Sequence, residues 1–201
     1  MMLRVRFTSP GHLPAAVAAV REALAARGII ALPTETFYGL AVDPANAAAV
    51  ARVFTLKGRE AAKALPVVAA SLDQIDRLVV LDGRRRAALT AAWPAPLTVV
   101  LPLRRPLAAA AGSLAIRIPD HALLRSLLAR VGPLTATSAN RSGAPPCGTA
   151  AAVAEALGGE VDVLLDGGAT LGGSPSTLLD WTADQPVLLR PGAWSLPPSW
   201  P

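Results

Sequence analysis

The chain holds two lysines, Lys57 and Lys63, and both fall in one short segment with Arg59 between them. A lysine ammonium is a mobile point charge and an arginine guanidinium is a planar fork, so together they suit phosphate or carboxylate oxygens. Two lysines would fall this close by chance roughly one time in sixteen, and so short a motif needs support from others. The segment is a candidate anion-binding loop. Chance clustering in an arginine-rich chain is the alternative.

Clusters of hydroxyl and amide side chains form the second group of candidates, at residues 34–36, 138–140 and 174–177. Each adjoins an apolar run of strand length, and loops on a rigid sheet commonly carry binding sites. Ser138 and Asn140 would point to the same side if their strand continues. The glycines before residue 174 could offer backbone N–H groups to a phosphate. Each cluster alone could equally satisfy the backbone groups of a turn.

Several other chemistries are not favoured. The sequence contains no G-x-x-x-x-G-K-[ST] loop, no G-x-G-x-x-G after the first apolar run and no G-x-S-x-G turn. The single cysteine, Cys147, excludes an internal disulfide. His12 and His121 lie far apart and lack the spacing of metal ligands, so we predict no metal site built from protein side chains.

An alternation of helices and strands must position these clusters. The spacing of apolar residues predicts helices at 14–27, 46–58, 83–92, 121–130 and 150–157. Strands are predicted at 28–32, 66–70, 97–103, 114–118, 134–137, 161–165, 177–180 and 187–190. Asn46 is expected to cap the second helix, and Gly28 to occupy the C-terminal cap of the first. The last two strands read as a hairpin, which predicts an α/β fold with a mixed sheet.

Composition limits the class of protein. The 201 residues are 52% hydrophobic but only 4% aromatic, which predicts a compact aliphatic core and disfavours modules that stack bases on rows of aromatic rings. The formal net charge of +5 indicates an anionic partner, although arginine runs are often solvated surface. We predict one domain over residues 1–195 and a proline-rich tail over 196–201. No signal peptide or membrane span is recognisable, so a soluble, cytoplasmic protein is expected.

The motifs also occur in a specific order. They run Pro-Thr-Glu-Thr-x-Tyr-Gly-Leu from residue 33, Lys-x-Arg from 57, Trp-Pro-Ala-Pro-Leu-Thr from 93, Ile-Arg-Ile-Pro from 116, Ser-Ala-Asn-x-Ser-Gly from 138, Ser-Thr from 176 and Leu-Arg-Pro-Gly from 189. This ordered set resembles the YrdC-type threonylcarbamoyl-AMP synthase family over nearly the whole chain. The resemblance implies a twisted mixed sheet flanked by helices, with a concave basic face. Glu60 and Ala64 stand where that family usually has prolines.

The resemblance further implies an enzyme that condenses L-threonine, bicarbonate and ATP to threonylcarbamoyl-AMP and pyrophosphate, for modification of adenosine 37 in tRNA. It assigns Lys57 and Arg59 to catalysis and to binding of the ATP phosphates, and Ser138, Asn140 and Arg190 to binding of ATP. The residues assigned to L-threonine are Thr34, Thr36, Arg117 and Ser176. Secondary candidates for the site are Lys63, Ser113 and Thr177. Mg²⁺ is expected on the phosphates. Proteins of the threonylcarbamoyl transferase complex are expected partners, and direct contact with tRNA or double-stranded RNA is a further expectation.

Two alternatives stay open at this point. A non-catalytic relative would use the basic face to bind tRNA or double-stranded RNA, with strong salt dependence and no ATP turnover. A carbamoyl-adenylating relative would use carbamoyl phosphate, but the acylphosphatase and zinc-finger segments expected beside it are absent from the sequence.

Overall fold

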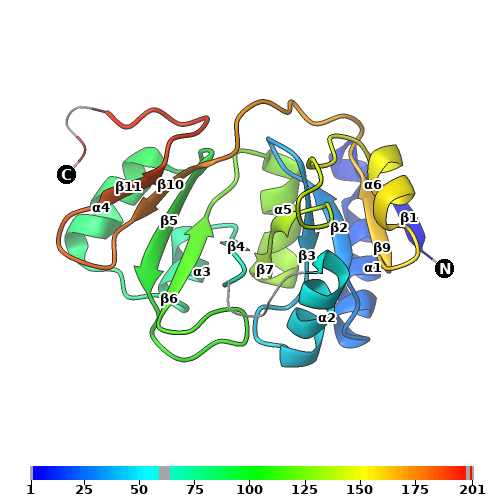
Figure 1. Ribbon diagram of the computed structural model, residues 1–201, viewed down its shortest axis with the longest axis horizontal. Helices are drawn as coiled ribbons and strands as arrows, with labels where there is room; N and C mark the ends of the chain where they lie inside the picture. Colours follow the sequence, from blue (N-terminus) through cyan, green and yellow to red (C-terminus); the bar gives the residue numbers. More distant parts are fainter. Residues whose placement is uncertain (1, 59–63, 198–199, 201) are drawn as a thin grey trace.

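Two mixed β-sheets lie side by side along the long axis of the molecule (Figure 1). The computed structural model describes residues 2–58, 64–197 and 200. The first sheet has the strand order β1-β9-β2-β3-β8, and the second has the order β11-β10-β5-β6-β4-β7. The N-terminus lies at the outer end of the first sheet and the C-terminus at the outer end of the second.

The described part of the chain forms short strands and helices in alternation. The strands are β1 (Leu3–Arg6), β2 (Ile30–Pro33), β3 (Tyr38–Ala41), β4 (Val67–Val68), β5 (Leu97–Pro102), β6 (Ser113–Arg117), β7 (Leu134–Thr135), β8 (Thr137–Ser138), β9 (Val163–Asp166), β10 (Thr177–Asp180) and β11 (Val187–Arg190). The helices are the 3-10 turn η1 (Pro10–His12) and α1 (Leu13–Ala25), α2 (Ala47–Lys57), α3 (Leu72–Asp76), α4 (Gly83–Ala92), α5 (Ala122–Val131) and α6 (Ala150–Leu157).

The first sheet is covered on both faces. Ile30 and Leu32 share a core with α1 and α5, where Leu127 lies, whereas Ala31 belongs to the opposite core with Val53 of α2 and residues of α6. Successive side chains of a strand point to opposite faces, so a strand buried on both sides reads as a continuous apolar run. This explains why the run 28–32 signals a strand in the sequence.

The second sheet has one covered face and one face that lines a cavity. Val99 and Ile116 pack in a core with residues of α3 and α4, whereas their neighbours Thr98, Ala115 and Arg117 line the cavity. The two sets alternate along β5 and β6, as the period of two in a strand requires. The sheet thereby holds polar side chains against a rigid apolar layer.

The helix ends follow the expected capping with one difference. The Asn46 side chain accepts a hydrogen bond from Ala49 N–H at 3.1 Å, and α2 ends at Lys57 with Gly58 in the left-handed conformation at φ 60°. At the end of α1, Arg27 takes the left-handed position (φ 59°) that we expected Gly28 to fill. Gly28 is instead required by close approach, because a Cβ there would lie 3.0 Å from the Ala23 carbonyl.

The expected strand at 134–137 is two strands in two different sheets. β7 pairs with β4 in the second sheet, β8 pairs with β3 in the first, and Ala136 makes the crossing between them. This crossing divides the expected single sheet into two. The elements β1, β3 and α3 were not predicted, because each is only four or five residues long and β3 also follows a segment of turn-forming residues.

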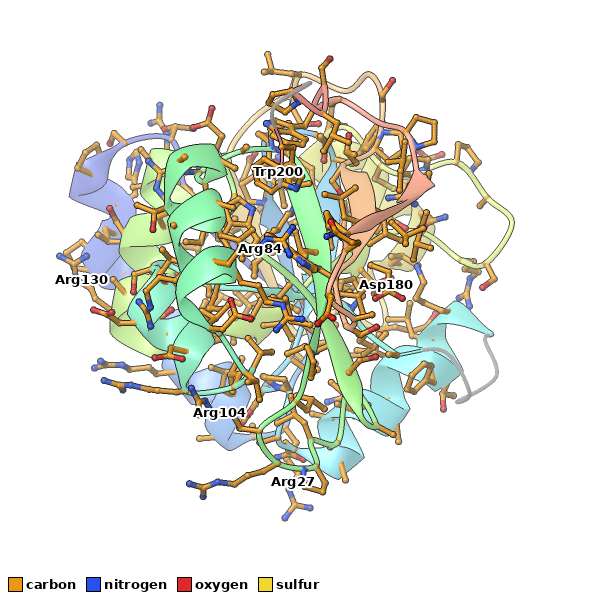
Figure 2. The ribbon with its side chains drawn as sticks, turned by 90° about the vertical axis from the view of Figure 1, so that its left-hand side faces the viewer. Arg27, Arg84, Arg104, Arg130, Asp180 and Trp200 are labelled. Carbon is orange, nitrogen blue, oxygen red and sulfur yellow. The ribbon has the colours of Figure 1, made fainter. Side chains whose placement is uncertain are left out.

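Trp194 and Trp200 pack against the core of the second sheet. The ring of Trp200 lies 6.0 Å from that of Trp181 and 5.1 Å from that of Trp194, and Arg84 Cζ lies 5.9 Å from the centre of the Trp181 ring. Figure 2 labels Trp200 and Arg84. Near the C-terminus, the Trp200 side chain is therefore held by aromatic contacts. No helix in the described ranges is both long and apolar enough to cross a membrane.

Candidate functional site

A cavity of about 710 Å³ lies between the two sheets. The first sheet contributes the β2–β3 loop and β8, and the second contributes residues of β4, β5, β6, β10 and β11. The polar and charged residues of its lining are Thr34, Thr36, Tyr38, Thr98, Arg117, Thr137, Ser138, Ser176 and Arg190. This volume is in the range of sites for nucleotides and other small ligands.

The β2–β3 loop presents two hydroxyls to the cavity. Thr34 Oγ1 donates to the Phe37 carbonyl at 2.8 Å and accepts from Thr36 N–H at 3.2 Å, so the loop closes on this hydroxyl. The two threonine hydroxyls are 3.2 Å apart, and both residues are buried. These threonines can therefore both stabilise the turn and bind a ligand, since the Thr34 hydroxyl fixes the loop that presents Thr36.

Arg117 on β6 faces this loop from the second sheet. Its Nη1 lies 2.5 Å from Glu35 Oε1, in an ion pair whose side chains are only 10% and 8% exposed. Burial lowers the pKa of Arg117, and the Glu35 carboxylate opposes that effect. Burial also raises the pKa of Glu35, and the Arg117 charge counteracts it. The expected partner of Arg117 is a threonine carboxylate, and in this structure the carboxylate beside it is Glu35.

Ser176 and Arg190 form the opposite rim of the cavity. Ser176 Oγ lies 2.8 Å from Thr98 Oγ1, and Arg190 Nη2 donates to the Ser176 carbonyl at 2.9 Å. Gly192 holds this rim in place, because a Cβ there would collide with the Pro175 carbonyl and with the backbone of Ser176. The chain just after β11 can therefore approach Ser176 this closely only through a glycine.

The Ser138–Asn140 loop rests on Lys57. Lys57 Nζ donates to the Ser138 carbonyl at 2.6 Å, to the Asn140 carbonyl at 2.9 Å and to Asn140 Oδ1 at 3.1 Å. The Lys57 carbonyl accepts from Ser142 N–H at 2.9 Å. Lys57 is 4% exposed and does not line the cavity, which differs from the phosphate contact expected for it.

The structure brings together part of the expected site. Thr34, Thr36, Arg117, Ser138, Ser176 and Arg190 line the cavity, whereas Asn140 lies behind its wall and donates from Nδ2 to the Ala144 carbonyl. Thr177 is buried and bonded to the Trp194 backbone, and Ser113 lies at the far end of β6 from Arg117; neither lines the cavity. Arg59 and Lys63 lie outside the described residues.

Sequence reasoning missed four residues of this region: Tyr38, Thr98 and Thr137, which line the cavity, and Glu35. Thr98 lines the cavity beside Ser176, and its signal in the sequence is the single polar residue of an otherwise apolar strand. Glu35 lies between the two threonines and was treated only as part of their motif. Its role depends on Arg117, which is 82 residues away in the chain, so no local pattern could indicate it.

Cationic side chains are sparse in the described wall of the cavity. Arg117 and Arg190 are the charged residues of its described lining, whereas Arg27, Arg104 and Arg130 lie on the outside of the molecule (Figure 2). Two hydroxyl pairs, two guanidinium groups and the exposed Ser138 can bind a small polar anion and an adjacent nucleotide. The fold and cavity define a two-sheet α/β protein with a composite site for small anionic ligands.

Comparisons with known proteins identify its family. The sequence model of the Sua5/YciO/YrdC family, described as "Telomere recombination", matches residues 22–192, and the chain belongs to this family. A threonylcarbamoyl-AMP synthase of Chromohalobacter salexigens is 44% identical over 173 residues, covering 82% of this chain and 90% of that protein. One from Bacillus subtilis is 36% identical over 192 residues, and the match covers 92% of this chain but 54% of that longer protein.

Solved structures agree with the fold. Pyrococcus abyssi Sua5 complexed with L-threonine has a TM-score of 0.84 and 34% identity, covering 96% of this chain and 57% of that one. Escherichia coli YciO has a TM-score of 0.82 at 22% identity, which bears on the fold alone. The expected mixed α/β fold is confirmed, and the names of the relatives favour the catalytic interpretation over the RNA-binding alternative.

Proposed function

We propose that this protein is a threonylcarbamoyl-AMP synthase, a nucleotidyltransferase that uses L-threonine, bicarbonate and ATP. The observation that carries the proposal is the composite cavity, in which Thr34, Thr36 and Ser138 of the first sheet line the same space as Arg117 of the second. The relatives named for this activity and the relative solved with L-threonine support it.

The reaction joins two anions, and this requirement explains the polar walls. Threonine and bicarbonate give N-carboxy-threonine and water, and a carboxylate oxygen of that carbamate then attacks the α-phosphorus of ATP. The bond from the α-phosphorus to the bridging oxygen breaks, and pyrophosphate leaves. Fixed donors that hold both reactants in line offset their repulsion and stabilise the charge of the transition state. No side chain has to act as a covalent nucleophile.

Individual roles follow from position. Arg117 would pair with the threonine carboxylate, and the hydroxyls of Thr34 and Thr36 would bind its polar groups. Ser138 and Arg190 would contact ATP, with Asn140 shaping the loop that carries Ser138. Ser176 would close the threonine side together with Thr98.

Mg²⁺ would enter with ATP. Carboxylates are its usual protein ligands, but the described lining contains none, and Glu35 in the β2–β3 loop is paired with Arg117. The described residues therefore fit a Mg²⁺ held by phosphate oxygens and water better than one in a protein cage. A bound Mg²⁺ would neutralise phosphate charge.

The product is a mixed anhydride of a carbamate and a phosphate, which water destroys. Such a product requires a transferase that consumes it, in keeping with the expected partners of the tRNA modification. Pyrophosphate release from ATP tests the proposal. Release should require threonine and bicarbonate together, and release that continues without threonine would exclude the proposed activity.

A further inference from the structure

Glu35 connects the two walls of the cavity. It lies in the β2–β3 loop of the first sheet, and its carboxylate meets Arg117 at the end of β6 in the second sheet. The residue itself does not line the cavity, whereas Thr34 and Thr36 on either side do. The ion pair is therefore placed behind the surface that a ligand would touch.

This ion pair is costly to bury. The Glu35 side chain is 8% exposed, and Oε2 has no hydrogen-bond partner among the described residues. Burial raises the pKa of Glu35 and Asp120 adds to that effect, whereas Arg117 and Arg125 oppose it. A buried pair of this kind adds little net stability compared with apolar residues of similar size. Its presence calls for a reason other than stability.

The geometry of Arg117 supplies that reason. Only Nη1 of the guanidinium is hydrogen-bonded within the described ranges, and the bond goes to Glu35 Oε1. A guanidinium is a planar fork with five N–H donors, so fixing one nitrogen also fixes the direction of the others. With Nη1 held from behind, the remaining edge is oriented for a second carboxylate, which arginine binds best in a two-bond contact.

We propose that Glu35 is a positioning residue for substrate recognition, which orients the Arg117 guanidinium toward the carboxylate of the amino-acid substrate. The inference rests on the proposed function. The threonine loop does not need Glu35 to keep its shape, since Thr34 Oγ1 already bonds the Phe37 carbonyl and two backbone N–H groups of the loop. Loss of Glu35 should therefore weaken recognition of the carboxylate and leave the rest of the site intact.

The test compares Glu35→Ala, Glu35→Asp and Glu35→Gln with a matched control, Glu22→Ala, at an exposed carboxylate on α1. Pyrophosphate release gives KM for threonine and for ATP and the kcat. L-threoninamide, which lacks the carboxylate, is titrated as a competitor to give its Ki. Thermal unfolding reports whether each variant is folded.

Glu35→Ala should raise KM for threonine about tenfold or more, the effect of losing one charge-assisted hydrogen bond. Glu35→Asp keeps the charge, but its shorter side chain does not reach Arg117 Nη1, so it should raise KM for threonine in the same way. This variant replaces Glu35→Ala in the test if the alanine variant does not fold. Glu35→Gln keeps the acceptor oxygen and should stay within about threefold of wild type. KM for ATP and the Ki of L-threoninamide should stay within about twofold throughout.

Three results would overturn the inference. The first is a KM for threonine that is unchanged in folded alanine and aspartate variants. The second is a Ki of L-threoninamide that rises in proportion to that KM, since the effect would then not concern the carboxylate. The third is a Glu35→Gln variant as impaired as Glu35→Ala. Failure of the proposed function is seen separately, as pyrophosphate release by the wild-type protein that does not depend on threonine.

Discussion

Replacing Lys57 by methionine would separate two roles for this lysine. The sequence motif predicts a phosphate contact, whereas the structure directs the ammonium to three oxygens of Ser138 and Asn140. Methionine keeps an unbranched apolar stem in the buried position and removes the donors. If Lys57 supports the loop, the substitution should lower the free energy of unfolding as well as the activity.

The expected size follows from the acceptors that lose their donor. A buried acceptor without a partner costs about 1–3 kcal/mol. Asn140 is 9% exposed, so its carbonyl stays shielded, whereas its Oδ1 still accepts from Ser138 Oγ and the carbonyl of the exposed Ser138 can regain water. We therefore expect a loss of about 1–3 kcal/mol. For a chain of this length that loss lowers the Tm by about 2–12 °C.

Urea unfolding and calorimetry measure the stability, and pyrophosphate release measures KM for ATP and kcat. Arg52→Met is the matched control, because Arg52 is an exposed cation on the same helix, paired with Asp162 at 3.1 Å, and should cost about 1 kcal/mol or less. A loop-supporting role predicts lost stability together with a raised KM for ATP. A Lys57→Met variant as stable as wild type, yet inactive, would refute this reasoning and restore the phosphate role.

Three further predictions follow from particular residues. Burial lowers the pKa of His121, whose Nδ1 accepts from a backbone N–H of α5. As the pH falls, His121 is therefore protonated in the unfolded chain before it is protonated in the folded protein. Stability present above pH 6.5 should fall as the pH drops through the folded pKa, and urea unfolding at about pH 7.5 and 5.5 should show this fall in wild type but not in His121→Asn. Arg27→Gly should raise the free energy of unfolding by about 0.5–1 kcal/mol by relieving a left-handed residue, whereas Arg27→Ala should not. Gly192→Ala should raise KM for threonine and lower the Tm, because the added Cβ would displace the backbone around Ser176. Gly83→Ala is the control, because a Cβ there meets open space. An unchanged KM in Gly192→Ala would contradict the role given to this glycine.

The sequence predicts best those elements whose signals are local. The helices at 83–92 and 150–157 have the predicted bounds, since an N-cap residue and an apolar face define them within one segment. The strand pair 177–180 and 187–190 is the antiparallel hairpin expected from its spacing. The capping of α2 by Asn46 is confirmed for the same reason.

Contacts between distant segments could not be predicted in this way. The division of 134–137 between two sheets depends on the partners of each half, which are β4 and β3. The direction of Lys57 depends on a loop 81 residues later, and Glu35 pairs with Arg117, 82 residues away in the chain. Motif order could therefore place Thr34, Thr36 and Ser138 in one site, but it could not distinguish residues that touch the cavity from those that support it.

This distinction changes where the phosphate charge of ATP must be balanced. The triphosphate carries several negative charges, and Arg117 is already neutralised by Glu35 while Lys57 is directed to the Ser138–Asn140 loop. Arg190 is the remaining cation of the described lining. One guanidinium and Mg²⁺ would balance only part of the negative charge of a triphosphate and a carbamate bound side by side. The phosphate role inferred from the lysine and arginine motif therefore stays a prediction for Arg59, whereas Lys57 holds the Ser138–Asn140 loop in place.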